Sequence, residues 1–325
     1  MNRRDILGTA LAFAGIARTG GSAAQSPAYP NRPIKVVVPF AAGGAGDAVA
    51  RIVGDRAQAE LGQALVIENK SGGNTVIGTQ AVASARADGY TLLQTTATNA
   101  IIPHLQENLP FDPDKAFLPV AGIGAVPLAL VVNAKSGFRT VADLVAHAKA
   151  ASGGIFYSSG GSGSQTHIAA VWFAQQARIS ATHVAFRGGG PAAQAVLADQ
   201  VQFTFASTIA VQEMAKAGQL RLIGVTSDQR VPTLPDVPTM IEQGFADFTP
   251  MLWYGYLAPA HTPRDVIDRL HGAFAKAVAD PRVQERLAGL GLVVKVRGPA
   301  EFARFIREES GRWGRVVRDN NIRME

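Results

Sequence analysis

The run Ile34-Lys35-Val36-Val37-Val38-Pro39-Phe40-Ala41-Ala42-Gly43-Gly44-Ala45-Gly46-Asp47 contains one complete structural unit. Its apolar first part is typical of a buried strand, and the glycines that follow indicate a tight turn. A helical pattern then continues from Asp47 to Leu61. A strand, a turn and a helix in this order form the repeating unit of α/β proteins.

The same unit recurs along the chain. Further strands are predicted at 65–68, 90–94, 129–132, 155–158, 183–186, 203–205, 220–225 and 253–257. Helical patterns separate them at 77–87, 140–151, 192–197 and 210–217, with Thr140 as an N-cap. The tail from residue 263 is helical apart from 292–296. This alternation predicts mostly parallel sheets flanked by helices.

The 325 residues, 47% of them hydrophobic, are enough for two domains. We predict two α/β lobes, lobe 1 from residues 29–128 plus 253–325 and lobe 2 from residues 129–252. The chain crosses between them near 126–133 and again near 249–257, in extended segments that suit a hinge. Ligands of such folds bind in the crevice at the carboxyl ends of the strands, so the turns after the strands are candidate sites.

The turn after the first strand is a candidate anion site. Backbone N–H groups at the positive end of a helix can hold a carboxylate or a phosphate. The alternative is a purely structural turn in which Asp47 caps the helix. A dinucleotide site fits less well, because Val49 occupies the third glycine position of the fingerprint. The candidate residues are Phe40, Ala42, Gly43, Gly44, Ala45, Gly46 and Asp47.

A second turn, from Ser158 to His167, offers hydroxyls and free amides that suit hydrogen bonds to carboxylate oxygens. It does not match the Gly-x-Ser-x-Gly elbow of serine hydrolases, because Ser164 stands where the last glycine is required. A lone histidine such as His167 is more often a packing or capping residue than a base. The candidate residues are Gly160, Ser162, Gly163, Ser164, Gln165, Thr166 and His167.

Three more turns follow predicted strands. Arg187 and Gly188 precede a helix, and Arg187 is either a ligand contact or a partner in a salt bridge. Thr95, Thr96 and Asn99 follow the third strand and can either contact the far end of a ligand or cap a helix. Ala206 and Ser207 follow the strand at 203–205.

Composition excludes several classes of function. The basic residues are dispersed without interleaved aromatics, which argues against a nucleic-acid partner. The six histidines lack metal-site spacing, and with no cysteine we expect neither a metal nor a cofactor. No nucleophile, base and orienting acid can be assembled from recognisable motifs, so we do not expect an enzyme.

The N-terminal residues are typical of a signal peptide at 1–24, with Arg3 and Arg4 before an apolar run and small residues up to Ala24. The paired arginines leave twin-arginine export open beside the general secretory route. Cleavage changes the formal charge from +6 (31 − 25) to +4 (28 − 24) by removing three arginines and one aspartate. Because the chain has no cysteine, we expect a periplasmic protein without a lipid anchor.

The chain resembles the tripartite tricarboxylate transporter solute-receptor family, also called the Bug family, over essentially its whole mature length. The order and spacing of several short motifs carry the resemblance. They are Tyr29-Pro30-Asn31-Arg32-Pro33-Ile34, Val37-Val38-Pro39-Phe40 with Gly43-Gly44 and Asp47, Glu68-Asn69-Lys70, Asp88-Gly89-Tyr90-Thr91-Leu92, Pro235-Asp236-Val237-Pro238-Thr239, Trp253-Tyr254-Gly255 and Pro259-Ala260-His261-Thr262-Pro263.

The resemblance implies a type II-like, two-lobed periplasmic-binding-protein fold that closes on a small carboxylate. It also implies a monomer that delivers the ligand to a two-component membrane permease. In such proteins the turn after the first strand and the glycine/serine turn of lobe 2 hold one carboxylate of the ligand. These turns correspond here to Phe40, Ala42, Gly43, Gly44 and Gly46, and to Gly160, Ser162, Ser164, Gln165, Thr166 and His167.

The chain departs from the family pattern at two of these turns. Relatives often carry Ser or Thr where this chain has Ala45-Gly46, and many carry Asp where it has Ala206-Ser207-Thr208. An acid at the second place would recognise an amino or hydroxyl group, so its absence favours a non-amino carboxylate, aliphatic or aromatic. Three functions stay open at this point: a transport receptor, a receptor that signals through a membrane sensor, and an exported hydrolase.

Overall fold

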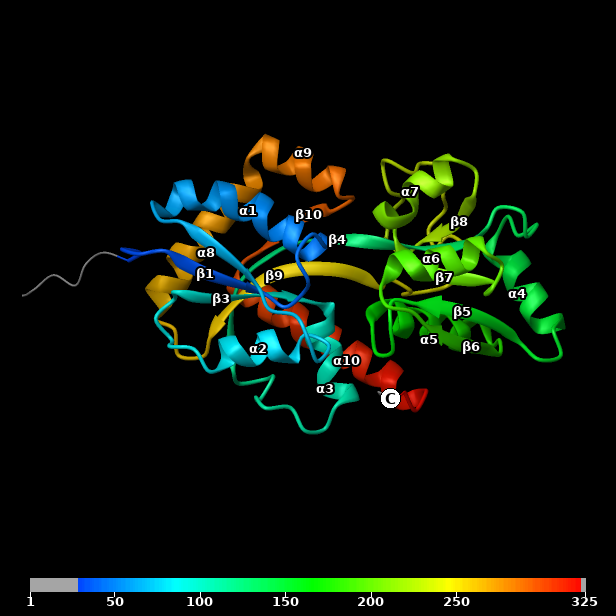
Figure 1. Ribbon diagram of the computed structural model, residues 1–325, viewed down its shortest axis with the longest axis horizontal. Coiled ribbons are helices and arrows are strands. Elements are labelled where there is room, and N and C mark those ends of the chain that lie inside the picture. The colour runs from blue at the N-terminus through cyan, green and yellow to red at the C-terminus, as the bar shows by residue number, and fades with distance from the viewer. Residues whose placement is uncertain (1–28, 323–325) are drawn as a thin grey trace, which may run out of the picture.

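The computed structural model describes residues 29–322 and shows an α/β protein (Figure 1). The predicted signal peptide, 1–24, lies outside the described residues. In Figure 1 the β-strands form two groups side by side, and the strands β4 and β9 run from one group to the other. The predicted fold class is confirmed. Within residues 29–322 no helix has both the length and the hydropathy that a membrane crossing requires.

The first group of strands is built around a parallel centre. Strand β1 (Ile34–Val38) pairs in parallel with β2 (Leu65–Asn69) and with β3 (Thr91–Thr96). Strand β9 (Met251–Pro259) joins β3 antiparallel, β4 (Phe117–Asn133) joins β9 antiparallel, and β10 (Val293–Arg297) pairs with the other edge of β4. The carboxyl ends of β1 and β3 therefore meet at one edge.

The second group repeats this plan. Strand β5 (Ile155–Ser159) pairs in parallel with β6 (Ala181–Ala185) and β7 (Phe203–Ser207). Both β7 and β8 (Leu220–Val225) pair antiparallel with the last residues of β4. The antiparallel pairs thus involve the strands that connect the two groups, and the parallel pairs lie where a helix crosses from one strand to the next.

Strand β4 changes partners midway along its length. Residues 117–127 pair with β9, and from Leu128 onward the strand pairs with β7 and β8. At this point the Thr226 hydroxyl accepts the Leu128 N–H at 2.9 Å and donates to the Pro250 carbonyl at 2.6 Å. Thr226 therefore ties the two connecting strands together where one group of strands gives way to the next.

The sequence predicted a strand at residues 129–132 within an extended crossing near 126–133, but not the part of β4 before it. Its first part contains Pro119, Gly122, Gly124 and Pro127, which are typical of loops. In the structure these glycines allow close packing, because a Cβ on Gly122 would stand 2.9 Å from the Phe302 ring. A glycine inside a strand commonly marks such a close approach.

Helices cover both faces of the first group of strands. Helices α1 (Ala45–Leu61), α8 (Arg264–Ala279) and α9 (Pro281–Gly289) pack on one another, and α10 (Pro299–Asp319) packs on α3 (Ala97–Leu105) and β4. Because side chains alternate along β1, Val36 enters the core beside α1 and α8, whereas Val37 enters the core beside α10. Helix α2 (Val76–Ala83) is shorter than the predicted 77–87, and α3 was not predicted.

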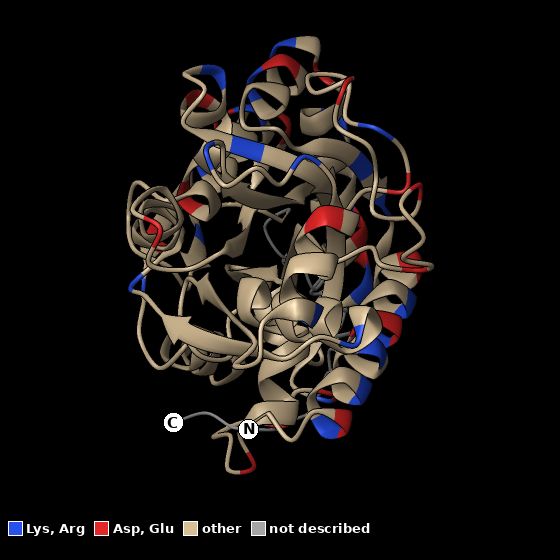
Figure 2. Cartoon of the chain, turned by 90° about the vertical axis from the view of Figure 1, so that its right-hand side faces the viewer, with Lys and Arg blue, Asp and Glu red and all other residues tan. Residues whose placement is uncertain are grey.

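Helices of the second group follow the predicted order. They are α4 (Val141–Ala150), α5 (Gln165–Ala177), α6 (Gly189–Leu197) and α7 (Thr208–Lys216). The predicted N-cap is confirmed, since the Thr140 hydroxyl accepts the Asp143 N–H at 3.2 Å. Helix α10 also reaches α5, where the rings of Trp313 and Trp172 meet edge to face at 5.9 Å. Figure 2 shows both signs of charge spread over outer helices and loops.

Candidate functional site

The turn after β1 is held by its own polar network. The Asp47 carboxylate accepts the Gly43 N–H at 3.0 Å and the Arg51 guanidinium at 3.0 Å. The amide of Asn69 donates to the Phe40 carbonyl at 3.1 Å, and the Gln94 amide donates to the Gly46 carbonyl at 2.8 Å. The turn after β1 is therefore tied to the last residue of β2 and to strand β3. Gly43, at a φ of +81°, adopts the left-handed conformation that favours glycine.

Asp47 remains ionised in this network, but its charge is balanced. The hydrogen bond from Arg51 is the main cause that lowers the pKa of Asp47, and the Gly43 N–H contributes. The side chain is buried, whereas Ala42, Gly43, Gly44 and Ala45 are exposed. Asp47 thus organises the turn and leaves the exposed backbone to face solvent.

Helix α1 begins without a side-chain cap. Its N-cap is Gly44, and no side chain accepts a hydrogen bond from the first turn. The first N–H groups of a helix have no partner within the helix, and they carry the positive end of its dipole. This end of α1 therefore offers several N–H donors to an anion.

The glycine/serine turn after β5 is largely satisfied within the protein. Ser164 caps α5, since its hydroxyl accepts the His167 N–H at 3.3 Å. The Gly160 N–H is bound by Thr166 and the Gly163 N–H by the His167 ring, both at 3.1 Å. Gln165 reaches out of the turn to donate to the Met251 carbonyl, at the start of β9. This turn presents hydroxyls and the remaining N–H groups, with Ser162 at intermediate exposure.

His167 belongs to a buried ring stack. Its imidazole lies on that of His183 with 3.9 Å between ring centroids, and Tyr157 stacks on His183 at 5.1 Å. Burial, followed by the neighbouring His183, lowers the pKa of His167 to about 4. The ring is therefore neutral near pH 7 and accepts the Gly163 N–H through Nδ1. This geometry makes His167 a part of the turn's scaffold and unsuited to act as a cationic ligand.

We expect the protein to lose stability between about pH 6.5 and about pH 4 because of His167. In this range the unfolded state binds a proton on this histidine and the folded state does not, so lowering the pH favours unfolding. The difference in pKa corresponds to about 3 kcal/mol of unfolding free energy across the whole range. Urea unfolding of the wild type and of His167→Asn, which keeps an acceptor near Nδ1, measures the effect. Equal pH dependence in the two proteins would contradict this assignment.

The turn after β6 lies against the glycine/serine turn. The Gly188 N–H donates to the Gly160 carbonyl at 3.2 Å, and a Cβ on Gly160 would stand 3.4 Å from Gly189. Gly188 is also the N-cap of α6, which has no side-chain cap, so Gly189 and Gly190 present N–H groups there. Sequence reasoning missed these two glycines, although the run of three glycines before Pro191 was visible.

Arg187 stands beside this uncapped helix end. It is exposed, and it makes no ion pair with any residue of the range 29–322. Its guanidinium is therefore available for an anion at the start of α6, where the helix dipole and the side chain carry charge of the same sign.

The remaining candidate residues either cap helices or are buried in the core. Thr96 accepts the Thr98 N–H at 3.4 Å, and Asn99 binds the Thr96 N–H and the Thr79 hydroxyl, so both complete the start of α3. Thr95 is 1% exposed and its hydroxyl has no hydrogen-bond partner among the described residues. Ser207 caps α7 through the Ala210 N–H, while Ala206 is buried opposite Ala129.

The structure thus distinguishes two kinds of helix start at the strand ends. The starts of α3, α5 and α7 are capped by Thr96, Ser164 and Ser207, whereas α1, α2, α6, α8 and α10 begin without side-chain caps. Among the uncapped starts, α1 follows β1 in the first strand group and α6 follows β6 in the second, and both have a glycine as N-cap. The N–H groups and the helix dipole at each of these starts can hold a carboxylate.

A family model described as the tripartite tricarboxylate transporter family receptor matches residues 49–322. The chain is similar to protein BugT of Bordetella pertussis, with 33% identity over 98% of this chain and 98% of the relative.

Several solved structures are similar to this chain over most of its length. The periplasmic binding protein BugD shares 31% identity at a TM-score of 0.79, covering 91% of this chain and 100% of that chain. The protein Rpa4515 of R. palustris, solved with adipate, shares 29% identity at a TM-score of 0.81, covering 90% and 99%. MatC (Rpa3494) from Rhodopseudomonas palustris, solved with bound malate, shares 30% identity at a TM-score of 0.76, covering 89% and 100%.

Proposed function

The chain belongs to the tripartite tricarboxylate transporter receptor family, and on this basis we propose that it captures a small carboxylate between two lobes and delivers it to a two-component membrane permease. Members of this family are periplasmic solute-binding proteins and not enzymes. The observation that carries the proposal is the pair of uncapped helix starts, α1 at Gly44 and α6 at Gly188, one in each strand group.

The proposed lobes are residues 29–128 plus 253–325 and residues 129–252. In this proposal the turn from Phe40 to Asp47 binds one carboxylate from lobe 1, through the N–H groups at the start of α1. Lobe 2 contributes the turn from Gly160 to His167, with Arg187 and Gly188 at the start of α6. Support comes from the exposure of residues 42–45 and from the free guanidinium of Arg187. In this proposal Thr95, Thr96 and Asn99 lie toward the far end of the ligand, and Ala206 and Ser207 belong to the lobe 2 side of the site.

The proposed ligand is a di- or tricarboxylate or an aromatic acid, without an amino group. Ala206 is 2% exposed and brings no charge to the site, so nothing at this position pairs with an ammonium group. Adipate and malate, which accompany two similar structures, are dicarboxylates, and neither carries an amino group. Tight binding of glutamate or aspartate, with no binding of simple dicarboxylates, would exclude this ligand class.

We propose that the protein acts as a monomer in the periplasm, after export by a signal peptide at residues 1–24.

Closure on the ligand uses β4 and β9 as the moving connection, because both cross between the strand groups. A ligand that contacts both lobes favours the closed arrangement by the difference between its affinities for the two states. The closed form is then the one that the permease recognises.

A thermal-shift screen of residues 25–325 tests the proposal directly. We expect a rise in the unfolding midpoint with one class among mono-, di- and tricarboxylates, aromatic acids, amino acids and sugars. A ligand at about a hundredfold excess over its Kd adds about 2.7 kcal/mol to the free energy of unfolding. A rise in the unfolding midpoint with a neutral sugar, together with no rise with any acid, would refute carboxylate binding.

A further inference from the structure

The start of α7, in the second strand group, is covered by a turn that belongs to the first group. This turn joins α9 to β10 and contains Gly291, and in Figure 1 the end of α9 points toward α7. A Cβ on Gly291 would stand 2.9 Å from the Ile209 side chain and 3.1 Å from the Thr208 hydroxyl oxygen. Thr208 and Ile209 are the first two residues of α7. The two strand groups therefore touch here, outside the connecting strands β4 and β9.

The Thr208 hydroxyl is buried in this contact. Thr208 is 3% exposed, and its hydroxyl has no hydrogen-bond partner among the described residues. The helix does not need this hydroxyl as a cap, because Ser207 already accepts the Ala210 N–H. Since a buried hydroxyl without a partner is unfavourable and water would pair with it in a separated arrangement, this group opposes the contact.

Gly291 makes the contact possible because it has no side chain. It ends α9 at a φ of +62°, and its N–H donates to the Ala288 carbonyl at 2.7 Å. Gly218 ends α7 in the same way, at a φ of +69° and with its N–H on the Ala215 carbonyl at 2.9 Å. Nothing lies within 4 Å of a Cβ at Gly218. The two glycines thus have the same backbone role, and only Gly291 faces the other strand group so closely.

The contact is linked through helix packing to the proposed carboxylate contacts. Helix α9 packs on α1, and α7 packs on α6. The starts of α1 and α6 are the proposed carboxylate contacts of the two lobes. When each lobe moves as one body, a ligand that draws α1 and α6 together also brings the turn after α9 against α7. Ligand and contact therefore favour the same closed arrangement.

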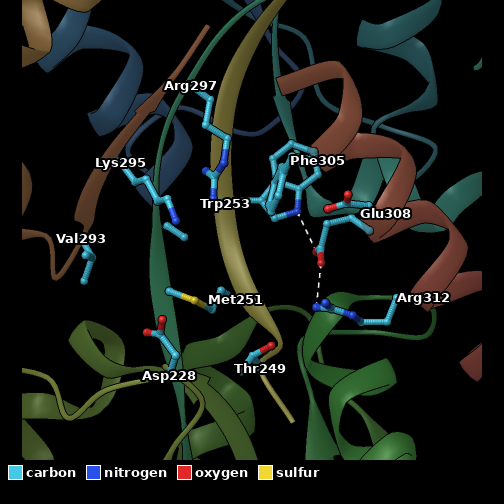
Figure 3. A pocket seen from close by; sticks show the side chains of 12 residues that line it. Asp228, Thr249, Met251, Trp253, Val293, Lys295, Arg297, Phe305, Glu308 and Arg312 are labelled. Carbon is cyan, nitrogen blue, oxygen red and sulfur yellow. Dashed lines mark hydrogen bonds and ion pairs between the residues drawn. The ribbon is translucent and has the colours of Figure 1, made fainter. Parts of the chain in front are cut away.

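Beside this contact the two strand groups are separated by a pocket of about 240 Å³. Val293, two residues after Gly291, belongs to its lining. Figure 3 shows Lys295 of β10 on one side of the pocket, Asp228 and Thr249 of the second group on another, and the connecting strands behind them. On this side of the molecule the contact at Gly291 is thus not part of a continuous packed interface, and the groups can part there without opening a core.

We propose that Gly291, Thr208 and Ile209 form a latch between the two lobes, which closes together with the ligand site and sets the balance between open and closed protein. The glycine permits closure, and the unpaired hydroxyl keeps the latch from holding the lobes shut without a ligand. Apparent affinity falls with the fraction of molecules in the binding-competent state, so the latch tunes affinity from outside the strand-end turns. The inference rests on the proposed function, because it takes the lobes to close on a ligand.

Spin labels measure the closed fraction without any ligand. Because the natural chain has no cysteine, Gln284→Cys on α9 and Glu213→Cys on α7, both at exposed positions, carry the only two labels. Double electron–electron resonance then gives the distance between them. We expect Gly291→Leu to lower the ratio of closed to open molecules at least about tenfold, because its side chain would overlap Ile209. Gly218→Leu brings the same backbone strain without the contact and should match the wild type.

Thr208→Val tests the hydroxyl in the opposite direction. Valine nearly keeps the shape of threonine and removes the unpaired group, so the ratio of closed to open molecules should rise about tenfold. Thr208→Ser keeps the hydroxyl and should not raise it. Equal distance distributions in Gly291→Leu and Gly218→Leu, or no rise in Thr208→Val, would overturn the latch.

Titration with adipate separates the latch from the proposed function. A Kd that rises about tenfold in Gly291→Leu and falls about tenfold in Thr208→Val would support both. Wild-type binding that Gly291→Leu leaves unchanged would overturn the latch and leave the proposed function standing. If neither adipate nor any other acid of the thermal-shift screen binds, the proposed function fails, while the ligand-free distances still decide whether the latch exists.

Discussion

Gly44→Val is expected to abolish ligand binding while the protein stays folded. A Cβ on Gly44 would meet only the Ala41 carbonyl, at an ordinary contact distance of 3.5 Å, and φ is −77°, so the backbone tolerates a side chain. The branched side chain would, however, cover the N–H groups at the start of α1. The loss of two or more charge-assisted hydrogen bonds should weaken binding by at least roughly a hundredfold.

Calorimetric titration with the acid identified by the thermal-shift screen measures this loss, and circular dichroism checks the fold. Gly289→Val is the control, since nothing lies within 4 Å of a Cβ at Gly289, the last residue of α9. Its affinity should equal that of the wild type. Unchanged affinity in Gly44→Val would remove the turn after β1 from the site.

Glu309→Leu is expected to lower the free energy of unfolding by about 3 to 5 kcal/mol. Glu309 is 4% exposed, and one carboxylate oxygen accepts the indole N–H groups of Trp253 and Trp313, each at 3.1 Å. Both tryptophans are buried, so leucine would leave two donors without partners. This change would also release α10 from β9, one of the two connecting strands.

Chemical denaturation of Glu309→Leu and Glu308→Leu compares the buried carboxylate with its exposed neighbour. Within residues 29–322, Glu308 forms an ion pair only with Arg304, at 4.0 Å, and both side chains are exposed. Its replacement should therefore change the free energy of unfolding by less than about 0.5 kcal/mol. Glu309→Gln keeps an acceptor for the two indole N–H groups. Its loss of unfolding free energy should therefore lie between those of Glu309→Leu and Glu308→Leu. A loss in Glu309→Leu no larger than that in Glu308→Leu would show that the indole contacts do not stabilise the fold.

Burial raises the pKa of Glu309, which adds a second test. A carboxylate whose pKa is raised on folding contributes stability that is fully present below its unfolded pKa and is lost as the pH rises through the folded value. His167 has the opposite sign, because its pKa falls on folding. Comparing the pH profiles of Glu309→Gln and His167→Asn with that of the wild type therefore separates the two groups.

The sequence alone determined most of the order of strands and helices, the fold class, the family and the turns to inspect. These features depend on neighbours along the chain: the alternation of apolar residues, the glycines after Pro39 and the capping pattern that begins at Thr140. Each of them is encoded within a segment of about ten to twenty residues, so it can be seen without a fold.

Only the tertiary structure decided which helix starts are free of side-chain caps and how far β4 extends. Gly122 and Gly124 predict a loop by their own preferences, yet they lie in a strand because β9 and β10 pair with it on both sides. The contact of Glu309 with Trp253 joins residues 56 positions apart. Hydrogen bonds and burial of this kind arise when distant segments are packed together, and no local pattern encodes which segments will meet.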